Sequence, residues 1–353
     1  MKRDKYMGMD VHQATTVVAV IDVEGKIGLE TIVPTAAGPI RRLIEGITGP
    51  VHVTLEETTQ AEWLHDLLEG FVAEVVVCDP RRNKLLVEGS KGDKADARKL
   101  AELLRTGMVR SVWHGRKTTR GLKEVVRAYE TFAVDTQRTM LRIKALYRSR
   151  GIATTGSAVY QKKERDGWLK QLTEVGMRQR AAWLYEQLDH VRELRKRAKA
   201  AVLSEGQQHK AVQLLRTVPQ VGPVRAAQIV ASAGTPHRFR TKRQFWSYSG
   251  LAVVTHTSAE YEMLGGRVVR RNKPVATRGL NANCNRRLKS VFISAATAGG
   301  SSHPWQPYLN QLKEKGMKPD MARLTLARKI AALVLSIWKK GESFDPKKLN
   351  WTN

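Results

Sequence analysis

Four carboxylates have the types and spacing that a metal-dependent site needs: Asp10, Glu56, Asp93 and Asp96. Asp93 and Asp96 are three residues apart in the segment DKADA, so on a helix they project from one face, about 5–6 Å apart at Cβ. Mg²⁺ and Mn²⁺ prefer carboxylate oxygens, and two such ions can clamp the attacking and leaving oxygens of a phosphoryl transfer. These residues therefore predict metal-dependent chemistry on a phosphodiester.

Glu57 is an alternative to Glu56, because both end the expected strand VHVTLEE. Side chains alternate between the two faces of a strand, so only one of these two glutamates can join the site. Four histidines could also be proposed as a base or a ligand, although an isolated histidine is more often an ordinary polar residue: His12, His52, His65 and His256. We expect a site built from carboxylates.

The elements that must position these carboxylates begin with three short strands joined by tight turns: YMGMDVH, TTVVAVID and IGLETIVPT. Helices and strands then alternate through AAGPIRRLIEGI, PVHVTLEE, AEWLHDLLEG, AEVVVCD and DKADARKLAELLRTG. This order predicts an α/β domain with the RNase H-like (RuvC-like) fold over residues 1–115. In that fold, Asp10 lies on the first strand, Glu56 ends the fourth, and the Asp93/Asp96 pair lies on the last helix.

Residues 116–205 have the pattern of long helices that pack along a seam. Residues recur at alternating steps of four and three, the spacing of a heptad repeat: Leu122, Val126, Tyr129, Ala133, Thr136, Met140, Ile143 and Tyr147. A second helical run places on one face Leu184, Leu188, Val191, Leu194 and Ala198. We expect a coiled-coil hairpin or an arm that dimerises with another copy, and an internal helical bundle is the alternative.

The third region, residues 206–353, is expected to be a mainly α-helical domain. Two helical runs flank the segment PQVGP at 219–223, which predicts a helix-hairpin-helix or a plain turn between two helices. A helix-hairpin-helix directs backbone N–H groups at a phosphate without reading the base. It would place Gly222 and Arg225 against nucleic acid.

Positive charge is concentrated after residue 115. Residues 1–115 hold 15 Lys/Arg against 17 Asp/Glu, whereas residues 116–353 hold 46 against 16, in a chain of net charge +28. This excess makes nucleic acid the expected partner. No membrane partner is expected, because the sequence has no run of 18 apolar residues and no cleavable signal.

The cysteines agree with a cytoplasmic location. Cys78 and Cys284 lie far apart, and the sequence has no CxxC motif. This usage excludes a zinc ribbon or finger and indicates a reducing compartment.

Basic clusters in the last region are expected to contact the nucleic-acid backbone. With the hairpin residues, the candidates are Gly222, Arg225, Arg240, Lys242, Arg243, Arg267, Arg270, Arg271, Lys273, Arg286 and Arg287. Trp246 and Tyr248 lie among these clusters, where they could stack on unpaired bases or belong to the core.

The segments GMDVHQATTVVAVID, VTLEETTQAEWLHDLL and DPRRNKLLVEGSKGDKADARKLAELL resemble the N-terminal domain of the DEDD transposases of the insertion sequence one-ten family. The likeness continues through TVPQVGPVRAAQIVASAG, FWSYSGLAVVTHTSAEY and the segment from HPWQPYL to KKGESFD. It covers nearly the whole chain and combines three elements in order: the DxxDA motif, the glycine hairpin and the closing helical segment.

The resemblance implies a recombinase that moves a mobile element between donor and target double-stranded DNA. Characterised members of this family are guided by a structured noncoding bridge RNA, so the resemblance implies such an RNA as a partner. Carried over by motif, Asp10, Glu56, Asp93 and Asp96 hold Mg²⁺ or Mn²⁺, and Ser258 forms a transient covalent bond to DNA. We also expect a homo-oligomer, a dimer or a tetramer.

The sequence departs from the family around the nucleophile. Ser258 is followed by Ala259, where the family commonly has a serine-glycine pair, so Thr257, Ser247 and Ser249 remain candidates. In the hairpin, Gln220 stands where a glycine is frequent.

Two other functions remain open. The first is a RuvC-like metal-dependent endonuclease or junction resolvase in which water attacks, and the second is a non-catalytic RNA-binding scaffold. A covalent protein–DNA adduct would separate the recombinase from the endonuclease, and any metal-dependent cleavage would exclude the scaffold.

Overall fold

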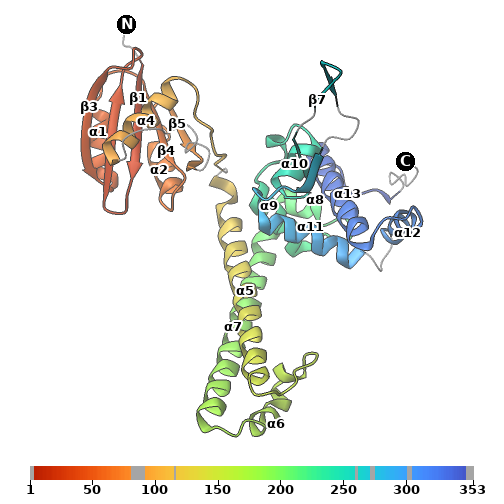
Figure 1. The fold of residues 1–353 in the computed structure, drawn as a ribbon. Coiled ribbons are helices and arrows are strands. Elements are labelled where there is room, and N and C mark those ends of the chain that lie inside the picture. Colours follow the sequence, from red (N-terminus) through yellow and green to blue (C-terminus); the bar gives the residue numbers. More distant parts are fainter. Residues whose placement is uncertain are drawn as a thin grey trace. The chain divides into compact units, whose positions relative to one another are not determined.

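The computed structural model describes residues 4–80, 92–114, 117–258, 261–270, 275–299 and 304–346, without the side chains of 256–258 and 275–278 (Figure 1). The chain divides into two compact units, Met1–Gly115 and Arg116–Asn353. The first is a mixed α/β unit, and the second is mainly helical.

One five-stranded sheet forms the centre of the first unit. Its strands are β1 (Lys5–Val11), β2 (Thr15–Ile21), β3 (Ile27–Pro34), β4 (Val51–Glu56) and β5 (Glu74–Cys78). They lie in the order β3-β2-β1-β4-β5, with the first three antiparallel and β4 and β5 parallel to β1. The helices among the described residues of this unit are α1 (Ala37–Glu45), α2 (Ala61–Leu68) and α4 (Asp93–Arg105). This arrangement is consistent with the RNase H-like fold expected from the sequence.

Different helices cover the two faces of the sheet. Side chains alternate between these faces along each strand. Met7, Met9 and Leu55 point to one face, where they pack with buried side chains of α1 and α2 in one core cluster. Gly8 lies on the other face beneath α4, where a Cβ would come 2.0 Å from the Ala97 carbonyl oxygen. The helix therefore approaches β1 closely only because this position has no side chain.

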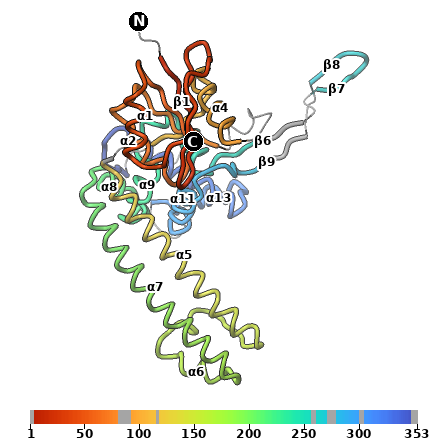
Figure 2. Tube along the Cα trace, turned by 90° about the vertical axis from the view of Figure 1, so that its left-hand side faces the viewer, coloured from red at the N-terminus to blue at the C-terminus, as the bar shows by residue number. Residues whose placement is uncertain are grey.

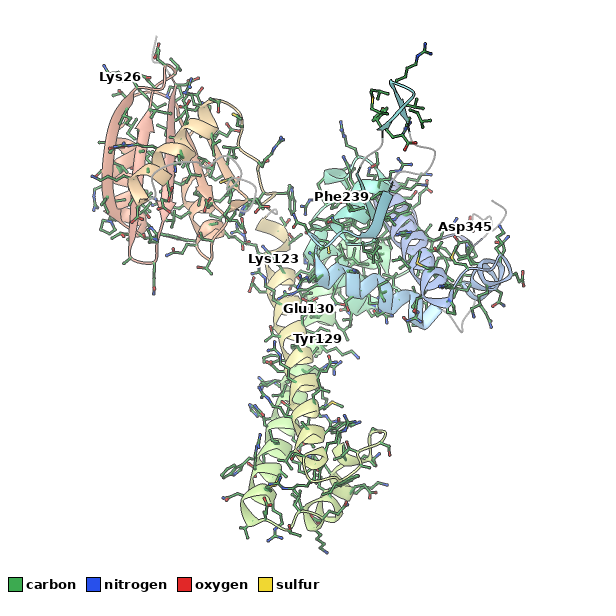
Figure 3. The ribbon with its side chains drawn as sticks, viewed as in Figure 1. Lys26, Lys123, Tyr129, Glu130, Phe239 and Asp345 are labelled. Atoms are coloured by element: carbon green, nitrogen blue, oxygen red, sulfur yellow. The ribbon has the colours of Figure 1, made fainter. Side chains whose placement is uncertain are left out.

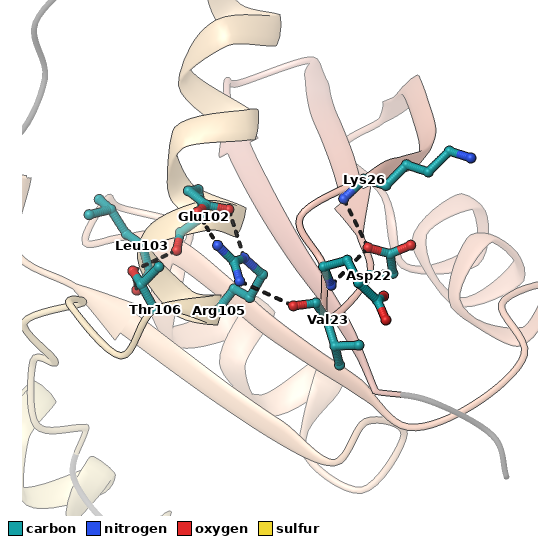
Figure 4. A network of polar contacts seen from close by, with 8 residues as sticks. Asp22, Val23, Lys26, Glu102, Leu103, Arg105 and Thr106 are labelled. Carbon is teal, nitrogen blue, oxygen red and sulfur yellow. Dashed lines mark hydrogen bonds and ion pairs between the residues drawn. The ribbon is translucent and has the colours of Figure 1, made fainter.

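Polar contacts fasten the far end of α4 to the sheet (Figure 4). Arg105, in the last turn of α4, pairs with Glu102 and donates a hydrogen bond to the Val23 carbonyl oxygen at 3.1 Å. The Asp22 carboxylate accepts a 2.9 Å bond from the Lys26 N–H and so shapes the turn that carries Val23. Gly8 and Arg105 together fix the direction in which α4 presents its first turn.

Two long antiparallel helices, here called the arm, form one part of the second unit: α5 (Arg120–Arg148) and α7 (Val175–Gln207) (Figure 1). The short α6 (Arg165–Lys170) lies in the connection between them. The end of α5 and the start of α7 share a core cluster that includes Ile143 and Tyr185.

The heptad seam of α5 is buried within the chain. Leu122, Val126 and Ile143 are 0%, 2% and 1% exposed, because α7 and the C-terminal helices pack against them. Cover from within the chain fits the expected hairpin or an internal bundle, and an arm that dimerises with another copy stays a prediction.

The remaining helices are α8 (Lys210–Leu215), α9 (Pro223–Ala233), α10 (Lys242–Tyr248), α11 (Arg286–Gly299), α12 (Gln306–Glu314) and α13 (Pro319–Lys340). Short 3₁₀ turns occur at Lys117–Thr119, Ala158–Tyr160, Lys162–Glu164 and Pro236–Arg238. Leu122 and Val126 of α5 and Val202 of α7 belong to the same buried cluster as these C-terminal helices. The base of the arm and the C-terminal helices thus share one core.

Two pairs of strands that were not expected from the sequence interrupt these helices (Figure 2). β6 (Val253–Ser258) pairs with β9 (Val275–Leu280), and β7 (Tyr261–Leu264) pairs with β8 (Arg267–Arg270), both antiparallel. Among the described residues, no helix has both the length and the apolar character to cross a membrane.

Candidate metal centre and nucleic-acid surface

Asp10 and Glu56 lie on the sheet face that α4 covers. Gly8 pairs with Thr54 across the parallel strands β1 and β4, and paired residues point to the same face. Two residues further along, Asp10 and Glu56 continue this alignment at the carboxyl ends of their strands. The sheet therefore directs both carboxylates toward one edge.

Asp93 and Asp96 stand in the first turn of α4. The structure brings Asp93 to Asp10 and adds a histidine: Asp10, His12 and Asp93 each offer one ligand atom, and these three atoms lie within 4.8 Å of one another. Asp96 lies outside this set of three and has its carboxylate 3.7 Å from Lys99 Nζ. Asp10 is the most protected of the three members, because its side chain is 22% exposed against 49% for His12 and 64% for Asp93.

The electrostatics of Asp10 reflect these neighbours. Burial raises the pKa of Asp10 above its ordinary value, and the negative charges of Asp93 and Asp96 raise it further, while His12 opposes the rise. A bound cation would offset both the burial and the negative neighbours that oppose the ionisation of Asp10. Oxygen donors of this kind fit Mg²⁺ or Mn²⁺.

Glu57 contacts a histidine outside the predicted metal site. Its Oε2 lies 2.8 Å from Nε2 of His114, and the His114 ring stacks on His65 with centroids 5.2 Å apart. Because Glu57 follows Glu56 immediately, it turns away from the face that carries Asp10. The structure thus favours Glu56 of the two glutamates for the position beside Asp10.

The candidate nucleophiles lie in the second unit. The backbone of Ser258 ends β6 opposite Val275, but the side chains of Ser258 and Thr257 lie outside the described residues. Ser249 is fully buried, and its hydroxyl donates a 2.6 Å bond to the Phe245 carbonyl oxygen. Ser249 is therefore much less accessible to a substrate than the exposed Ser247.

Ser247 is exposed and remains open to a substrate. Its hydroxyl accepts a 3.2 Å bond from the side-chain amide of Asn281. Ser247 keeps its place as an alternative to Ser258.

The predicted hairpin is a tight turn between α8 and α9. Gln220 has a φ of 67°, the left-handed conformation that favours glycine, which explains why a glycine at this position would suit the turn. Gly222 precedes the first turn of α9. Arg225 donates a 2.9 Å bond to the Gln220 carbonyl oxygen and a 3.2 Å bond to the Ser294 hydroxyl, so part of its hydrogen-bonding capacity supports the turn.

Four predicted nucleic-acid contacts meet in one pocket of about 990 Å³: Gly222, Arg225, Arg286 and Arg287. Arg138 and Lys199 of the arm also line it. Figure 3 marks Tyr129 and Glu130 on the α5 wall. Glu130 lies 3.2 Å from Arg287, so one acidic group offsets part of this positive charge.

The other predicted contacts are dispersed. Arg240, Lys242 and Arg243 are exposed at the start of α10, and Arg267 and Arg270 are exposed on the β7–β8 hairpin. Arg271 and Lys273 lie outside the described residues.

Trp246 and Tyr248 belong to the core rather than to a stacking surface. The Trp246 indole donates a 3.0 Å bond to the Arg328 carbonyl oxygen, and the Tyr248 hydroxyl donates a 2.9 Å bond to the Ser232 carbonyl oxygen. Both rings pack against the buried cluster of the C-terminal helices.

His12, one of four isolated histidines in the sequence that could serve as a base or ligand, is the one that joins the carboxylates. It lies just beyond β1 and two residues after Asp10, so its side chain can follow the same face. That spacing was the available indication, but a single histidine in a loop has no periodic pattern to mark it.

The fold and carboxylates define a mixed α/β domain of the DEDD type joined to a helical region. A family model for IS110 DEDD transposases, described as "Transposase", matches residues 7–149, and one described as "Transposase IS116/IS110/IS902 family" matches residues 212–309. The chain belongs to the IS110 family of DEDD transposases.

A curated relative supports this assignment. The chain is 26% identical over 137 residues to a protein of Sinorhizobium fredii (strain NBRC 101917 / NGR234) named "Putative transposase y4pF/y4sB". The match covers 37% of this chain and 32% of that relative.

Proposed function

We propose that this protein cuts and rejoins DNA strands of a mobile insertion element, with a divalent ion held by Asp10, Glu56, Asp93 and Asp96. The observation that carries the proposal is the meeting of Asp10 with Asp93 at the first turn of α4, in a chain of the DEDD transposase family. Mg²⁺ or Mn²⁺ would supply charge stabilisation at the phosphate and polarise the attacking and leaving oxygens.

The four carboxylates occupy different positions in the proposed metal site. Asp10 is the partly buried anchor, and Asp93 extends the site toward solvent. Glu56 lies on the same sheet face as Asp10, and Asp96 is the second acidic residue in the first turn of α4. Rigid elements carry all four, which keeps the ligand positions constant while DNA enters.

Ser258 is the proposed nucleophile. Its hydroxyl gives up a proton as Oγ forms a bond to phosphorus and one P–O bond to deoxyribose breaks, and the departing oxygen takes up a proton. The phosphodiester energy is retained in the serine–DNA bond, so rejoining by the reverse attack needs no nucleotide cofactor. Family membership supports this role, as do the exposed arginines of the neighbouring β7–β8 hairpin.

A structured noncoding guide RNA is the second proposed partner, beside donor and target double-stranded DNA. Residues 116–353 hold 46 Lys/Arg against 16 Asp/Glu, more positive charge than a single short duplex contact requires. The pocket that contains Arg225, Arg286 and Arg287 supplies one basic surface, and the start of α10 supplies another.

Trapping with denaturant tests this mechanism. Full-length protein is incubated with its element-end DNA, guide RNA and Mg²⁺ or Mn²⁺, then denatured and separated from free DNA. The wild type should leave a covalent protein–DNA band, whereas Ser258→Ala and Asp10→Asn should not, although both still bind DNA. Ser247→Ala is the matched control and should leave the band unchanged.

A water-using endonuclease is the second candidate. It is favoured by one observation: Asp10, His12 and Asp93 all belong to the first unit, which has its own core. Wild-type protein that cuts DNA with either ion but never forms the band would establish this alternative. Loss of the band from Ser247→Ala alone would move the nucleophile to Ser247.

A further inference from the structure

We propose that His12 is a direct ligand of the divalent ion, together with Asp10 and Asp93, and that it gives the site a preference for Mn²⁺ over Mg²⁺. The inference deepens the proposed function, because it rests on the carboxylate site described above. It assigns a ligand and a metal selectivity that four carboxylates alone would not supply.

The distances around His12 are those of neighbouring ligands on one ion. Nε2 of His12 lies 3.2 Å from Asp10 Oδ2 and 3.6 Å from Asp93 Oδ2. Ligands about 2.1 Å from an ion lie about 3.0 Å apart in octahedral geometry and about 3.4 Å apart in tetrahedral geometry. An ion can therefore enter between the three side chains with only small adjustments.

The backbone of His12 is held by neighbouring strands. Its N–H donates a 2.9 Å bond to the Thr15 carbonyl oxygen, and its own carbonyl accepts a 3.0 Å bond from the Thr35 hydroxyl. The Thr35 hydroxyl also lies 2.8 Å from that of Thr16. These contacts fix the turn between β1 and β2, so the imidazole stays near Asp10 although half of it is exposed.

Imidazole changes which ion the site prefers. Mg²⁺ binds oxygen ligands and water almost exclusively, whereas transition ions accept nitrogen readily. Mn²⁺ accepts both carboxylate oxygen and imidazole nitrogen. Of Mg²⁺ and Mn²⁺, the ions proposed for the site, Mn²⁺ therefore fits this mixed set of ligands better. The alternative is a simple hydrogen bond between His12 and Asp10, in which case the imidazole contributes nothing to selectivity.

Pulsed electron paramagnetic resonance of Mn²⁺ bound to full-length protein separates these possibilities. Nitrogen-14 modulation from a directly bound imidazole should appear in the wild type and disappear in His12→Ala. Calorimetric titration should show the Mn²⁺ affinity of His12→Ala falling by about tenfold or more, while its Mg²⁺ affinity changes little. Circular dichroism checks that the variant is folded.

His52→Ala is the matched control. His52 lies on the same sheet, and its Nδ1 is 3.2 Å from Glu74 Oε2, so it forms a similar histidine–carboxylate contact away from Asp10. This variant should keep the nitrogen signal and both affinities.

Two results would overturn the inference in distinguishable ways. Wild-type protein that binds Mn²⁺ without nitrogen modulation, or His12→Ala that keeps it, removes His12 from the ligand set and leaves the carboxylate site standing. Mn²⁺ binding that is unchanged in Asp10→Asn shows that the carboxylate site is itself misplaced, and the proposed function then fails with it.

Discussion

Gly8 decides how closely the acidic helix can approach Asp10. The residue lies two positions before Asp10 on β1, and α4 rests directly on it. A Cβ at this position would come 2.0 Å from the Ala97 carbonyl oxygen and 2.5 Å from the Ala101 nitrogen. Both are backbone atoms, so the helix itself would have to move.

Gly8→Ala should therefore displace α4 and separate Asp93 from Asp10. We expect a loss of about 1–3 kcal/mol in the free energy of unfolding, together with a large loss of Mn²⁺ affinity, measured by chemical denaturation and calorimetry. Gly28→Ala on β3 is the control, because its Cβ would meet only the Val20 carbonyl oxygen at 3.8 Å. If Gly8→Ala binds Mn²⁺ as the wild type does, the close approach of α4 does not matter for the site.

At the scale of elements, the arm is an internal part of the second unit. Leu122 near the start of α5 is fully buried in the cluster of the C-terminal helices, whereas Leu141 on the same helix is 59% exposed. Heptad spacing showed which face of α5 is covered, but spacing is the same whether the covering helix belongs to this chain or to another copy.

Leu122→Ala should lower the free energy of unfolding by about 2–5 kcal/mol, because it leaves a cavity in a closed core. Leu141→Ala should change it by less than about 0.5 kcal/mol. Denaturant titration measures both, and light scattering measures the assembly. Equal stability of the two variants, with a smaller assembly for Leu122→Ala, would instead indicate that this seam joins two copies.

The outer end of the arm is held by a charged pair. The two terminal guanidinium nitrogens of Arg165, Nη1 and Nη2, donate 2.7 Å bonds to the Asp189 carboxylate. The Arg165 guanidinium carbon lies 4.7 Å from the centre of the Tyr185 ring. The hydrogen bonds from Arg165 are the main cause that lowers the pKa of Asp189 below its ordinary value. The pair ties the start of α6 to α7.

Asp189→Asn should destabilise the protein by about 1.5–3 kcal/mol at neutral pH. The pKa of Asp189 is lower in the folded state than in the unfolded state, where it is about 3.9. The ion pair therefore stabilises the fold fully above that unfolded-state pKa. The stabilisation is lost as the pH falls through the folded-state pKa. The stability difference between wild type and variant should therefore be constant near neutral pH and shrink below about pH 4. Asp135→Asn is the control, because it removes only an exposed contact with Arg138, and it should have almost no effect on stability. A stability loss in Asp189→Asn that does not depend on pH would exclude the ion pair as the cause of that loss.

For the whole molecule, charge separates the two units. The first is close to neutral, and residues 116–353 carry the excess of Lys and Arg. Affinity for duplex DNA should fall steeply with salt, with a slope of about −0.9 for each phosphate neutralised. Replacing Arg286 and Arg287 with Ala should reduce the slope by up to about two, whereas Arg127→Ala, which removes an arginine paired with Glu124, should leave it unchanged. A flat titration in fluorescence anisotropy would contradict this account of binding.

The sequence predicted the first unit well because alternation of apolar residues marks each strand and helix. Those patterns place Asp10 on β1, Glu56 at the end of β4 and Asp93 on α4. β7 and β8 were missed because each is only four residues long, too short for a periodic pattern. His12 could not be singled out from the other three candidate histidines, because its significance depends on a contact with Asp93, which lies 81 residues away along the chain.

Sequencing of rejoined DNA junctions in cells tests the central claim most directly. Cells carry a plasmid with the intact element and its noncoding RNA and express either the full-length wild type or Asp10→Asn at equal level. The wild type should produce precise rejoined junctions, and Asp10→Asn should produce none while still binding DNA. Junctions formed by Asp10→Asn at the wild-type rate would contradict the claim that the carboxylates on β1, β4 and α4 hold the metal that drives strand exchange.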